Sequence, residues 1–136
     1  MQVNETDSVA GVHANALRVT LQSMEDYIAI KQIFRLHELS FERSLTPTTD
    51  EWENYYKLDR TLQEQIQWSR NTMTFCVLTF KNGFTVVGKS APAAPENFNK
   101  YLAEKLAYED AIREAWPLFG FALREARMEH SHASTL

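Results

Sequence analysis

The segment Lys81-Asn82-Gly83, between two strand-forming runs, constrains the fold of this chain more than any other. Residues 73–80 and 84–87 are rich in Thr, Phe, Val and Leu, which favour extended strands. The pair Asn82-Gly83 is typical of a two-residue type I′ turn, because both turn positions need a positive φ. The sequence therefore predicts a β-hairpin. Its expected cross-strand pairs are Phe80 with Thr85, Leu78 with Val87, and Cys76 with Lys89, while Met73, Phe75, Val77, Phe84 and Val86 share the other face.

Amphipathic segments on both sides of this hairpin predict helices that cover its faces. A lone hairpin is marginally stable in water, so it needs such cover. Apolar residues recur at helical spacing over residues 23–43, over 48–71 after Pro47, and again over 96–116 and 118–128. Thr48 and Glu51 fit a capping box at the start of the second segment. Trp116-Pro117 is expected to separate the last two helices.

The expected fold class is α+β, a β-hairpin packed against two C-terminal helices, with two N-terminal helices. The chain has 136 residues, 44% of them hydrophobic and 24% charged, which is typical of one globular domain. The expected organisation is a frayed tail over residues 1–19, a helical half over 20–71, the hairpin with its helices over 72–128, and a polar tail over 129–136. Because the apolar faces and open edges of a hairpin invite association, we also expect a homodimer.

Charge and cysteine content indicate which classes of partner and which cellular compartment to expect. Eighteen acidic and fourteen basic residues give a net charge of −4, so the field of the whole protein does not attract nucleic acids or anionic membranes. The single Cys76 cannot form an intramolecular disulfide, and the first residues lack the basic and apolar regions of a signal peptide. No apolar run is long enough to span a bilayer. These features predict a protein of a reducing cytoplasm.

Residues 83–90 match the phosphate-loop pattern G-x-x-x-x-G-K-S. A phosphate loop needs a nest of backbone amides between a strand and a helix that starts at the Lys-Ser pair. Here the residues are expected in a turn and a strand, and Pro92 and Pro95 prevent a long helix from starting at Ser90. We therefore interpret the match as a coincidence.

No other residues form a convincing catalytic or metal-binding pattern. His130 and His132 lack a third ligand nearby, and a solvated tail explains them better than a metal site. Cys76 lies within the predicted hairpin, where a small buried side chain is expected rather than a nucleophile. We predict no catalytic residue, no metal and no cofactor.

Aromatic side chains are dense over residues 52–68, where a partner-binding role competes with a role in the core. Aromatic residues at this density either fill a core or anchor an interface, and the core is the commoner of the two. The candidate partner-binding residues are Trp52, Tyr55, Tyr56 and Trp68.

Several short motifs follow one another over residues 74–124, in an order and spacing too specific for chance. They are Thr74-Phe75-Cys76-Val77-Leu78-Thr79, Lys81-Asn82-Gly83-Phe84-Thr85-Val86-Val87-Gly88, Pro95-Glu96-Asn97-Phe98-Asn99, Ala107-Tyr108-Glu109-Asp110-Ala111, Trp116-Pro117-Leu118 and Gly120-Phe121-Ala122-Leu123. This part of the chain resembles the gene-product-forty-nine-like family of small tailed-phage and prophage proteins, of the N-four type. Residues before about 71 match nothing that we can place.

The resemblance implies a phage origin and action in the cytoplasm of the bacterial host. The family has no established activity, so no catalytic residue can be carried over. The matching residues with a direct structural use are Asn82 and Gly83 in the turn, Phe98 as an anchor of the following helix, and Trp116 and Pro117 at its end.

The leading functional expectation is a non-enzymatic phage accessory protein that binds and modulates a host protein, as an inhibitor or adaptor in host takeover or anti-defence. One alternative is a binder of nucleic acid or of a small nucleotide signal. Its basic residues would be Arg70, Lys81, Lys89 and Lys100, although Glu96 and Glu104 interrupt them. The other alternative is a small hydrolase that uses Cys76 or Lys89.

Overall fold

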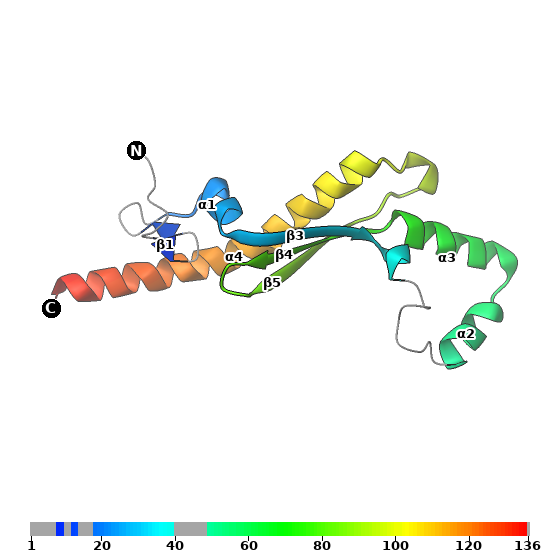
Figure 1. Ribbon diagram of the computed structural model, residues 1–136, viewed down its shortest axis with the longest axis horizontal. Helices are drawn as coiled ribbons and strands as arrows, with labels where there is room; N and C mark the ends of the chain where they lie inside the picture. The colour runs from blue at the N-terminus through cyan, green and yellow to red at the C-terminus, as the bar shows by residue number, and fades with distance from the viewer. Residues whose placement is uncertain (1–7, 10–11, 14–17, 40–48, 136) are drawn as a thin grey trace. The chain divides into compact units, whose positions relative to one another are not determined.

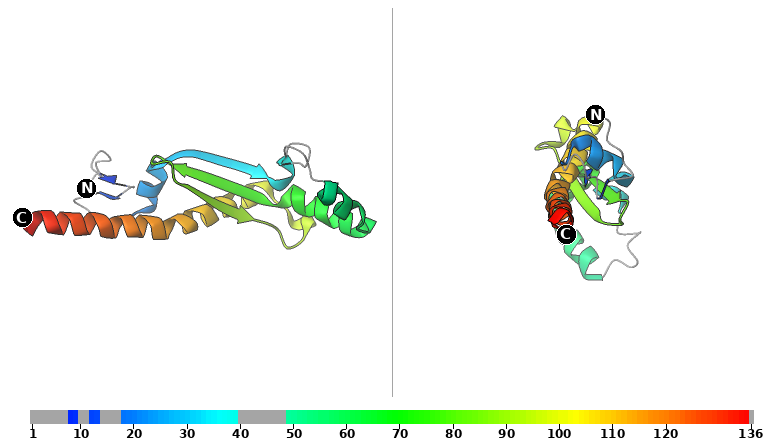
Figure 2. Two further views of the ribbon diagram at one scale, coloured as in Figure 1. Left: turned by 90° about the horizontal axis from the view of Figure 1, so that it is seen from below. Right: turned by 90° about the vertical axis from the view of Figure 1, so that its left-hand side faces the viewer.

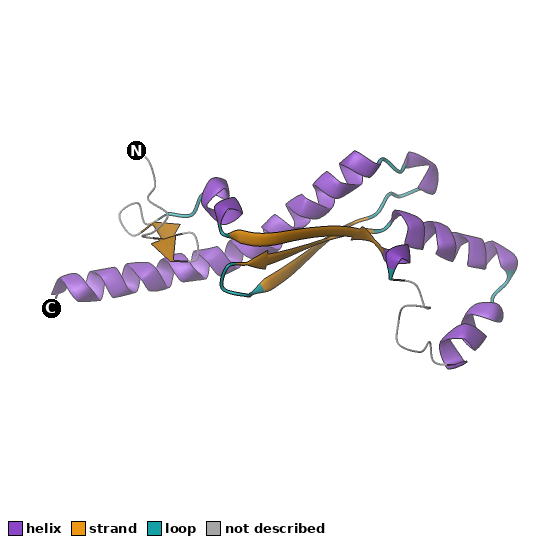
Figure 3. Cartoon of the chain, viewed as in Figure 1, coloured by secondary structure: helices purple, strands orange, loops and turns teal. Residues whose placement is uncertain are grey.

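The computed structural model describes residues 8–9, 12–13, 18–39 and 49–135 of the chain. Its helices and strands follow one another as Figures 1 and 3 show. They are β1 (Ser8–Val9), β2 (Val12–His13), α1 (Leu21–Asp26), β3 (Ile28–Arg35), the 3-10 helix η2 (Leu36–Glu38), α2 (Thr49–Tyr56), α3 (Arg60–Thr72), β4 (Thr74–Phe80), β5 (Thr85–Ser90), the 3-10 helix η3 (Pro95–Asn97) and α4 (Lys100–Thr135).

The main sheet has three strands in the order β3-β4-β5, and β1 and β2 pair separately as an antiparallel ladder. The direction of β3 follows from its two ends. The Lys81 N–H donates to the Tyr27 carbonyl and the Leu36 N–H donates to the Met73 carbonyl, both at 3.0 Å, so β3 and β4 are antiparallel. The α+β class is confirmed, with a third strand beside the predicted hairpin. Within residues 1–19, predicted as a frayed tail, the structure describes β1 and β2.

The predicted helix over residues 23–43 is wrong. Helix α1 ends at Asp26, and β3 begins two residues later; residues 40–43 lie outside the described residues. The apolar residues Met24, Ile28 and Ile33 recur at roughly helical spacing, but Ile28 and Ile33 are β-branched and suit an extended backbone next to β4. Backbone pairing with β4 therefore makes this segment a strand.

The β4–β5 hairpin forms as predicted, but its register differs by one residue. The Gly83 N–H donates to the Phe80 carbonyl at 2.8 Å, the Phe80 N–H donates to the Phe84 carbonyl at 2.9 Å, and Gly83 has a φ of 88°. This is a three-residue loop in which a type I turn is followed by a left-handed glycine, and not a two-residue type I′ turn. The corrected cross-strand pairs are Phe80 with Phe84, Leu78 with Val86, and Cys76 with Gly88.

The helices before the hairpin are shorter than predicted. In place of one helix over 48–71, α2 ends at Tyr56 and α3 begins at Arg60. The carboxylate of Asp59 accepts a hydrogen bond of 2.8 Å from the Leu62 N–H and caps α3. The proposed capping residue Thr48 lies outside the described residues.

The two predicted C-terminal helices are one helix. Helix α4 begins at Lys100, where the Asn99 side chain accepts a hydrogen bond from the Leu102 N–H, and it continues through Pro117. A proline removes a single N–H from a helix, and the turns on both sides of it keep their own bonds. The residues described over 129–135, predicted as a polar tail, are also helical. Within the described residues, no helix is long and apolar enough to cross a membrane.

The chain divides into two compact units, each made of segments distant in sequence, and the predicted single domain stays a prediction. Unit 1 comprises Met1–Lys31, Val77–Val87 and Ala111–Leu136. Its core includes an aromatic cluster of Tyr27, Phe80 and Phe119, with ring centroids between 5.2 and 6.2 Å apart. Figure 2 shows the closed end of the β4–β5 hairpin next to the start of β3.

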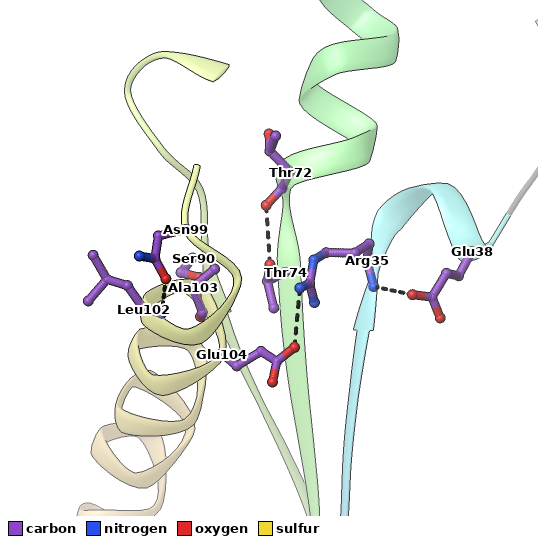
Figure 4. Close-up of polar contacts among 9 residues, drawn as sticks. All are labelled: Arg35, Glu38, Thr72, Thr74, Ser90, Asn99, Leu102, Ala103 and Glu104. Carbon is purple, nitrogen blue, oxygen red and sulfur yellow. Dashed lines mark hydrogen bonds and ion pairs between the residues drawn. The ribbon is translucent and has the colours of Figure 1, made fainter. Parts of the chain in front are cut away.

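Unit 2 comprises Gln32–Cys76 and Gly88–Asp110. Phe34 of β3 stacks on Phe75 of β4 with a centroid separation of 5.5 Å. Thr74 is fully buried, and its hydroxyl donates to the Thr72 carbonyl at 3.1 Å. Figure 4 shows these polar contacts where β3, β4 and the first turns of α4 meet. Unit 2 carries helices α2 and α3, which hold the candidate site.

Candidate partner-binding surface

Helices α2 and α3 are joined by a short connection that glutamine side chains hold in place. The Gln63 side-chain amide donates to the carbonyls of Tyr55 and Leu58, both at 3.1 Å. One turn later, the Gln67 amide donates to the Tyr55 hydroxyl at 3.1 Å. These bonds hold the last turn of α2 against the first turns of α3, so the aromatic residues of α2 have a defined place.

Two of the aromatic candidates are exposed, contrary to a role in the core. Tyr55 is half-buried, and its ring lies 5.3 Å from that of Tyr56 in an edge-on arrangement. Tyr56 is 67% exposed and Trp68 is 48% exposed, so the core interpretation is wrong for both. The side chain of Trp52 lies outside the described residues. We call Tyr55, Tyr56, Trp68 and the groove beside them the α2–α3 aromatic surface.

A shallow groove with a volume of about 370 Å³ runs along α3 on this surface. It is lined by Tyr55, Arg60, Gln63, Glu64, Gln67, Trp68 and Asn71. The Arg60 guanidinium and the Glu64 carboxylate form an exposed ion pair at 3.3 Å, which neutralises one wall of the groove. The groove therefore offers amide hydrogen-bonding groups beside two aromatic rings, a combination suited to a polypeptide.

The end of α3 is tied to η2 and to the residue that follows it. The Arg70 guanidinium donates to the carbonyls of Leu36 and Leu39, at 3.4 and 3.0 Å. Next to this contact the Arg35 guanidinium pairs with Glu104 at 3.2 Å and lies 5.2 Å from the centre of the Phe98 ring (Figure 4 shows the ion pair). The exposed side chain of Trp68 therefore belongs to a helix that is held in place by other residues of unit 2.

The residues predicted to define the fold have different roles in the structure. Asn82 accepts a hydrogen bond of 3.0 Å from the Phe84 N–H, and Gly83 takes the left-handed position of the turn. Phe98 is half-buried between η3 and α4, against the guanidinium of Arg35. Trp116 and Pro117 lie inside α4, so the prediction that they end a helix is wrong.

The segment that matches a phosphate loop is a turn followed by strand β5. The Lys89 N–H donates to the Asp110 carboxylate at 2.9 Å, and the Ser90 hydroxyl donates to the Ala103 carbonyl at 2.6 Å. The next α-helix begins only at Lys100. The backbone amides of this segment are arranged as a strand, and the Lys-Ser pair does not open a helix.

Cysteine and histidine side chains contribute to no metal-binding cluster in the described part of the chain. Cys76 is fully buried in β4, as a small core residue would be. Across residues 8–9, 12–13, 18–39 and 49–135, no group of three or more His, Cys, Asp or Glu side chains is placed to hold a metal ion.

Sequence reasoning missed the polar residues that build the aromatic surface. Gln63 and Gln67 are four residues apart and therefore share one side of α3, which is a pattern visible in the sequence. Their acceptors on Tyr55 and Leu58 follow only from the break between α2 and α3. The role of Arg70 likewise depends on the carbonyls of Leu36 and Leu39, which lie in a segment predicted to be helical over residues 23–43 and form η2 and its C-terminal end instead.

One comparison with known proteins gives a match. The model of the family described as Phage protein (N4 Gp49/phage Sf6 gene 66) matches residues 19–127. The match therefore extends the resemblance seen over residues 74–124 into the N-terminal half, including β3, α2 and α3. No curated protein matches the chain, and no solved structure matches it.

Proposed function

Because the chain belongs to the N4 Gp49/phage Sf6 gene 66 family of phage proteins, we propose that it is a non-enzymatic accessory protein that binds and modulates a protein of the bacterial host. The α2–α3 aromatic surface is the proposed contact. A phage protein of this kind would act in the host cytoplasm, as an inhibitor or adaptor in host takeover or anti-defence.

The exposure of Trp68 and Tyr56 on a fixed pair of helices is the observation that carries this proposal. Trp and Tyr dominate the residues on which binding energy depends, because they bury a large area at a small cost in side-chain entropy. In water the same exposure is unfavourable, by about 25 cal/mol for each Å² of apolar surface. A partner that covers Trp68 recovers this free energy.

The polar groups around Trp68 support a protein as the partner. Gln67 and Asn71 line the groove and carry amides that can both donate and accept hydrogen bonds. A surface that binds nucleic acid requires an excess of positive charge. The Arg60–Glu64 ion pair leaves no such excess on its wall of the groove.

A pull-down from host lysate with the full chain tests the proposal. The lysate is treated with nuclease, and the tagged protein is compared with Trp68→Ala and with Tyr101→Ala. Tyr101 is the matched control because it is 81% exposed on α4 and does not line the groove. We expect one dominant host protein that Tyr101→Ala retains and Trp68→Ala loses, by at least about tenfold in captured amount.

Two results would contradict the proposal. Equal capture by both variants would show that the α2–α3 aromatic surface is not the contact. Capture of no host protein, together with salt-dependent retention of the chain on DNA or RNA, would replace the proposal by the nucleic-acid alternative. Thermal melting of each variant is the control for folding, and since Trp68 is half exposed we expect a small change only.

A further inference from the structure

The groove of the α2–α3 aromatic surface lies between two rows of side chains on α3. Residues four apart along a helix form such rows. One row consists of amides, and the other consists of an ion pair followed by an aromatic ring. The first row is Gln63, Gln67 and Asn71, the second is Arg60, Glu64 and Trp68, and Tyr55 of α2 completes the lining. The groove therefore follows the axis of α3 and can receive an extended chain laid along the helix.

Hydrogen-bond donors without an internal acceptor lie along this groove. The Gln63 amide is already engaged, because it donates to two backbone carbonyls, both at 3.1 Å. The Tyr55 hydroxyl accepts from Gln67 and keeps its own hydrogen to donate. Within the described residues, the Trp68 indole N–H and the Asn71 side-chain amide make no hydrogen bond. Each of these groups can donate to a carbonyl of a bound chain.

These donors distinguish between the backbone conformations of a bound polypeptide. A β-strand binds along the edge of a sheet, through alternating N–H and C=O groups, and α3 has no such edge. A helix uses its backbone groups internally and needs a continuous apolar groove, whereas one row of this groove consists of amides. A polyproline II segment has no internal hydrogen bonds, and its prolines carry a carbonyl but no N–H. Such a segment presents only acceptors to the free donors, and aromatic rings are the usual lining of its binding sites.

The length and the charge of the groove suit a short uncharged segment. From Arg60 to Asn71, the lining residues span about 16 Å of α3 at about 1.5 Å per residue. A polyproline II helix rises about 3.1 Å per residue, so about five residues fit along the groove. The Arg60–Glu64 ion pair, at 3.3 Å, leaves its wall without net charge. Prolines carry no charge, so they match this wall.

We propose that the groove on α3 binds a proline-rich segment in the polyproline II conformation. The proline rings pack on Trp68 and Tyr55, and the carbonyls accept hydrogen bonds from the Trp68 indole and the Asn71 amide. This inference rests on the proposed function, because it names the chemistry of the host segment that the α2–α3 aromatic surface recognises. A polyproline II segment is formed before it binds and loses little conformational entropy, so a shallow groove is sufficient for a weak contact.

An NMR titration of the full isotope-labelled chain with a proline peptide tests the inference. The peptide has about ten prolines and uncharged ends, and it is added to about 5 mM because such a segment binds weakly. The indole N–H signals are assigned with Trp68→Phe and Trp116→Phe. We expect the Trp68 signal to move to saturation and the Trp116 signal to stay, since Trp116 is also exposed but lies on α4 in unit 1. A glycine–serine peptide of the same length should move neither signal.

Single substitutions test the two kinds of contact separately. Trp68→Ala should raise the dissociation constant, followed on the backbone signals of α3, at least about tenfold, because it removes a ring on which the prolines pack. Asn71→Ala should raise it about fivefold, as expected for the loss of one hydrogen bond. Asn97→Ala is the matched control, because Asn97 is also exposed but lies in η3 and does not line the groove. It should leave the dissociation constant unchanged.

Three results would overturn the inference. They are a Trp68 signal that the proline peptide does not move, equal movement with the glycine–serine peptide, and a dissociation constant that neither Trp68→Ala nor Asn71→Ala changes.

The pull-down from host lysate separates this inference from the proposed function. If Trp68→Ala loses the host protein but the proline peptide neither binds nor displaces it, the host contact stands and its proline-rich chemistry is wrong. If the peptide binds at Trp68 while Trp68→Ala retains the host protein, the groove binds proline and the proposed host contact is wrong.

Discussion

Gly83 has a backbone conformation that residues with a Cβ atom rarely adopt. Its φ is 88°, and an added Cβ would meet no atom within 4 Å. Substitution therefore costs backbone strain without a steric clash. We expect Gly83→Val to lower the free energy of unfolding by about 1–3 kcal/mol, because a β-branched residue is the least tolerant of positive φ. Urea denaturation followed by circular dichroism measures this change.

Two further glycine-site variants separate strain from loss of flexibility. Gly120 lies in α4 with no atom within 4 Å of an added Cβ, so Gly120→Ala should stabilise the protein by about 0.5–1 kcal/mol. Gly83→Asn should cost less than Gly83→Val, since Asn tolerates the left-handed region. Equal stabilities for Gly83→Val and the unmodified chain would contradict the proposed turn geometry.

At the scale of elements, an ion pair joins the end of β3 to the first turns of α4. The side chain of Arg35 is 11% exposed and that of its partner Glu104 is 30% exposed. Glu104→Gln leaves the Arg35 guanidinium largely buried without its counter-charge. We expect it to lower the free energy of unfolding by about 1–2 kcal/mol, measured by urea denaturation.

The exposed pair within α3 is the matched control for this ion pair. Arg60 and Glu64 lie 3.3 Å apart but are both well exposed to solvent. Solvent screens such a pair, so Glu64→Gln should change stability by less than about 0.5 kcal/mol. If Glu64→Gln lowered the free energy of unfolding as much as Glu104→Gln, burial would not explain the contribution of the Arg35–Glu104 pair to stability.

At the scale of the whole molecule, the two units share their main elements. Strands β3, β4 and β5 and helix α4 each begin in one unit and end in the other. Partial unfolding of either unit would therefore interrupt the same strands and helix that the other unit uses. We expect a single cooperative unfolding transition.

Tryptophan fluorescence tests this cooperativity, because the tryptophans are divided between the units. Trp116 belongs to unit 1, and Trp52 and Trp68 belong to unit 2. A variant that combines Trp52→Phe and Trp68→Phe reports on unit 1, while Trp116→Phe reports on unit 2. For each variant, the urea midpoint measured by fluorescence should agree with the midpoint measured by circular dichroism on the same variant. Fluorescence and circular dichroism midpoints that differ within one variant would mean that the units unfold separately.

The features that depend on neighbouring residues could be predicted from the amino-acid sequence. Strands β4 and β5 follow from runs of β-branched and aromatic residues, and their connection follows from Asn82-Gly83. The amphipathic period predicted helices where α3 and most of α4 lie. In each case the deciding interactions are within a few residues along the chain.

The features that depend on distant partners could not be predicted in this way and follow from tertiary contacts. The segment Ile28–Arg35 has apolar spacing compatible with a helix, and it becomes a strand because its backbone groups pair with β4, about forty residues away in sequence. Whether Trp68 and Tyr56 are buried likewise depends on which elements pack on α2 and α3, and in the structure they are 48% and 67% exposed. Backbone pairing and burial are contacts between distant segments, so local propensity and periodicity alone cannot determine them.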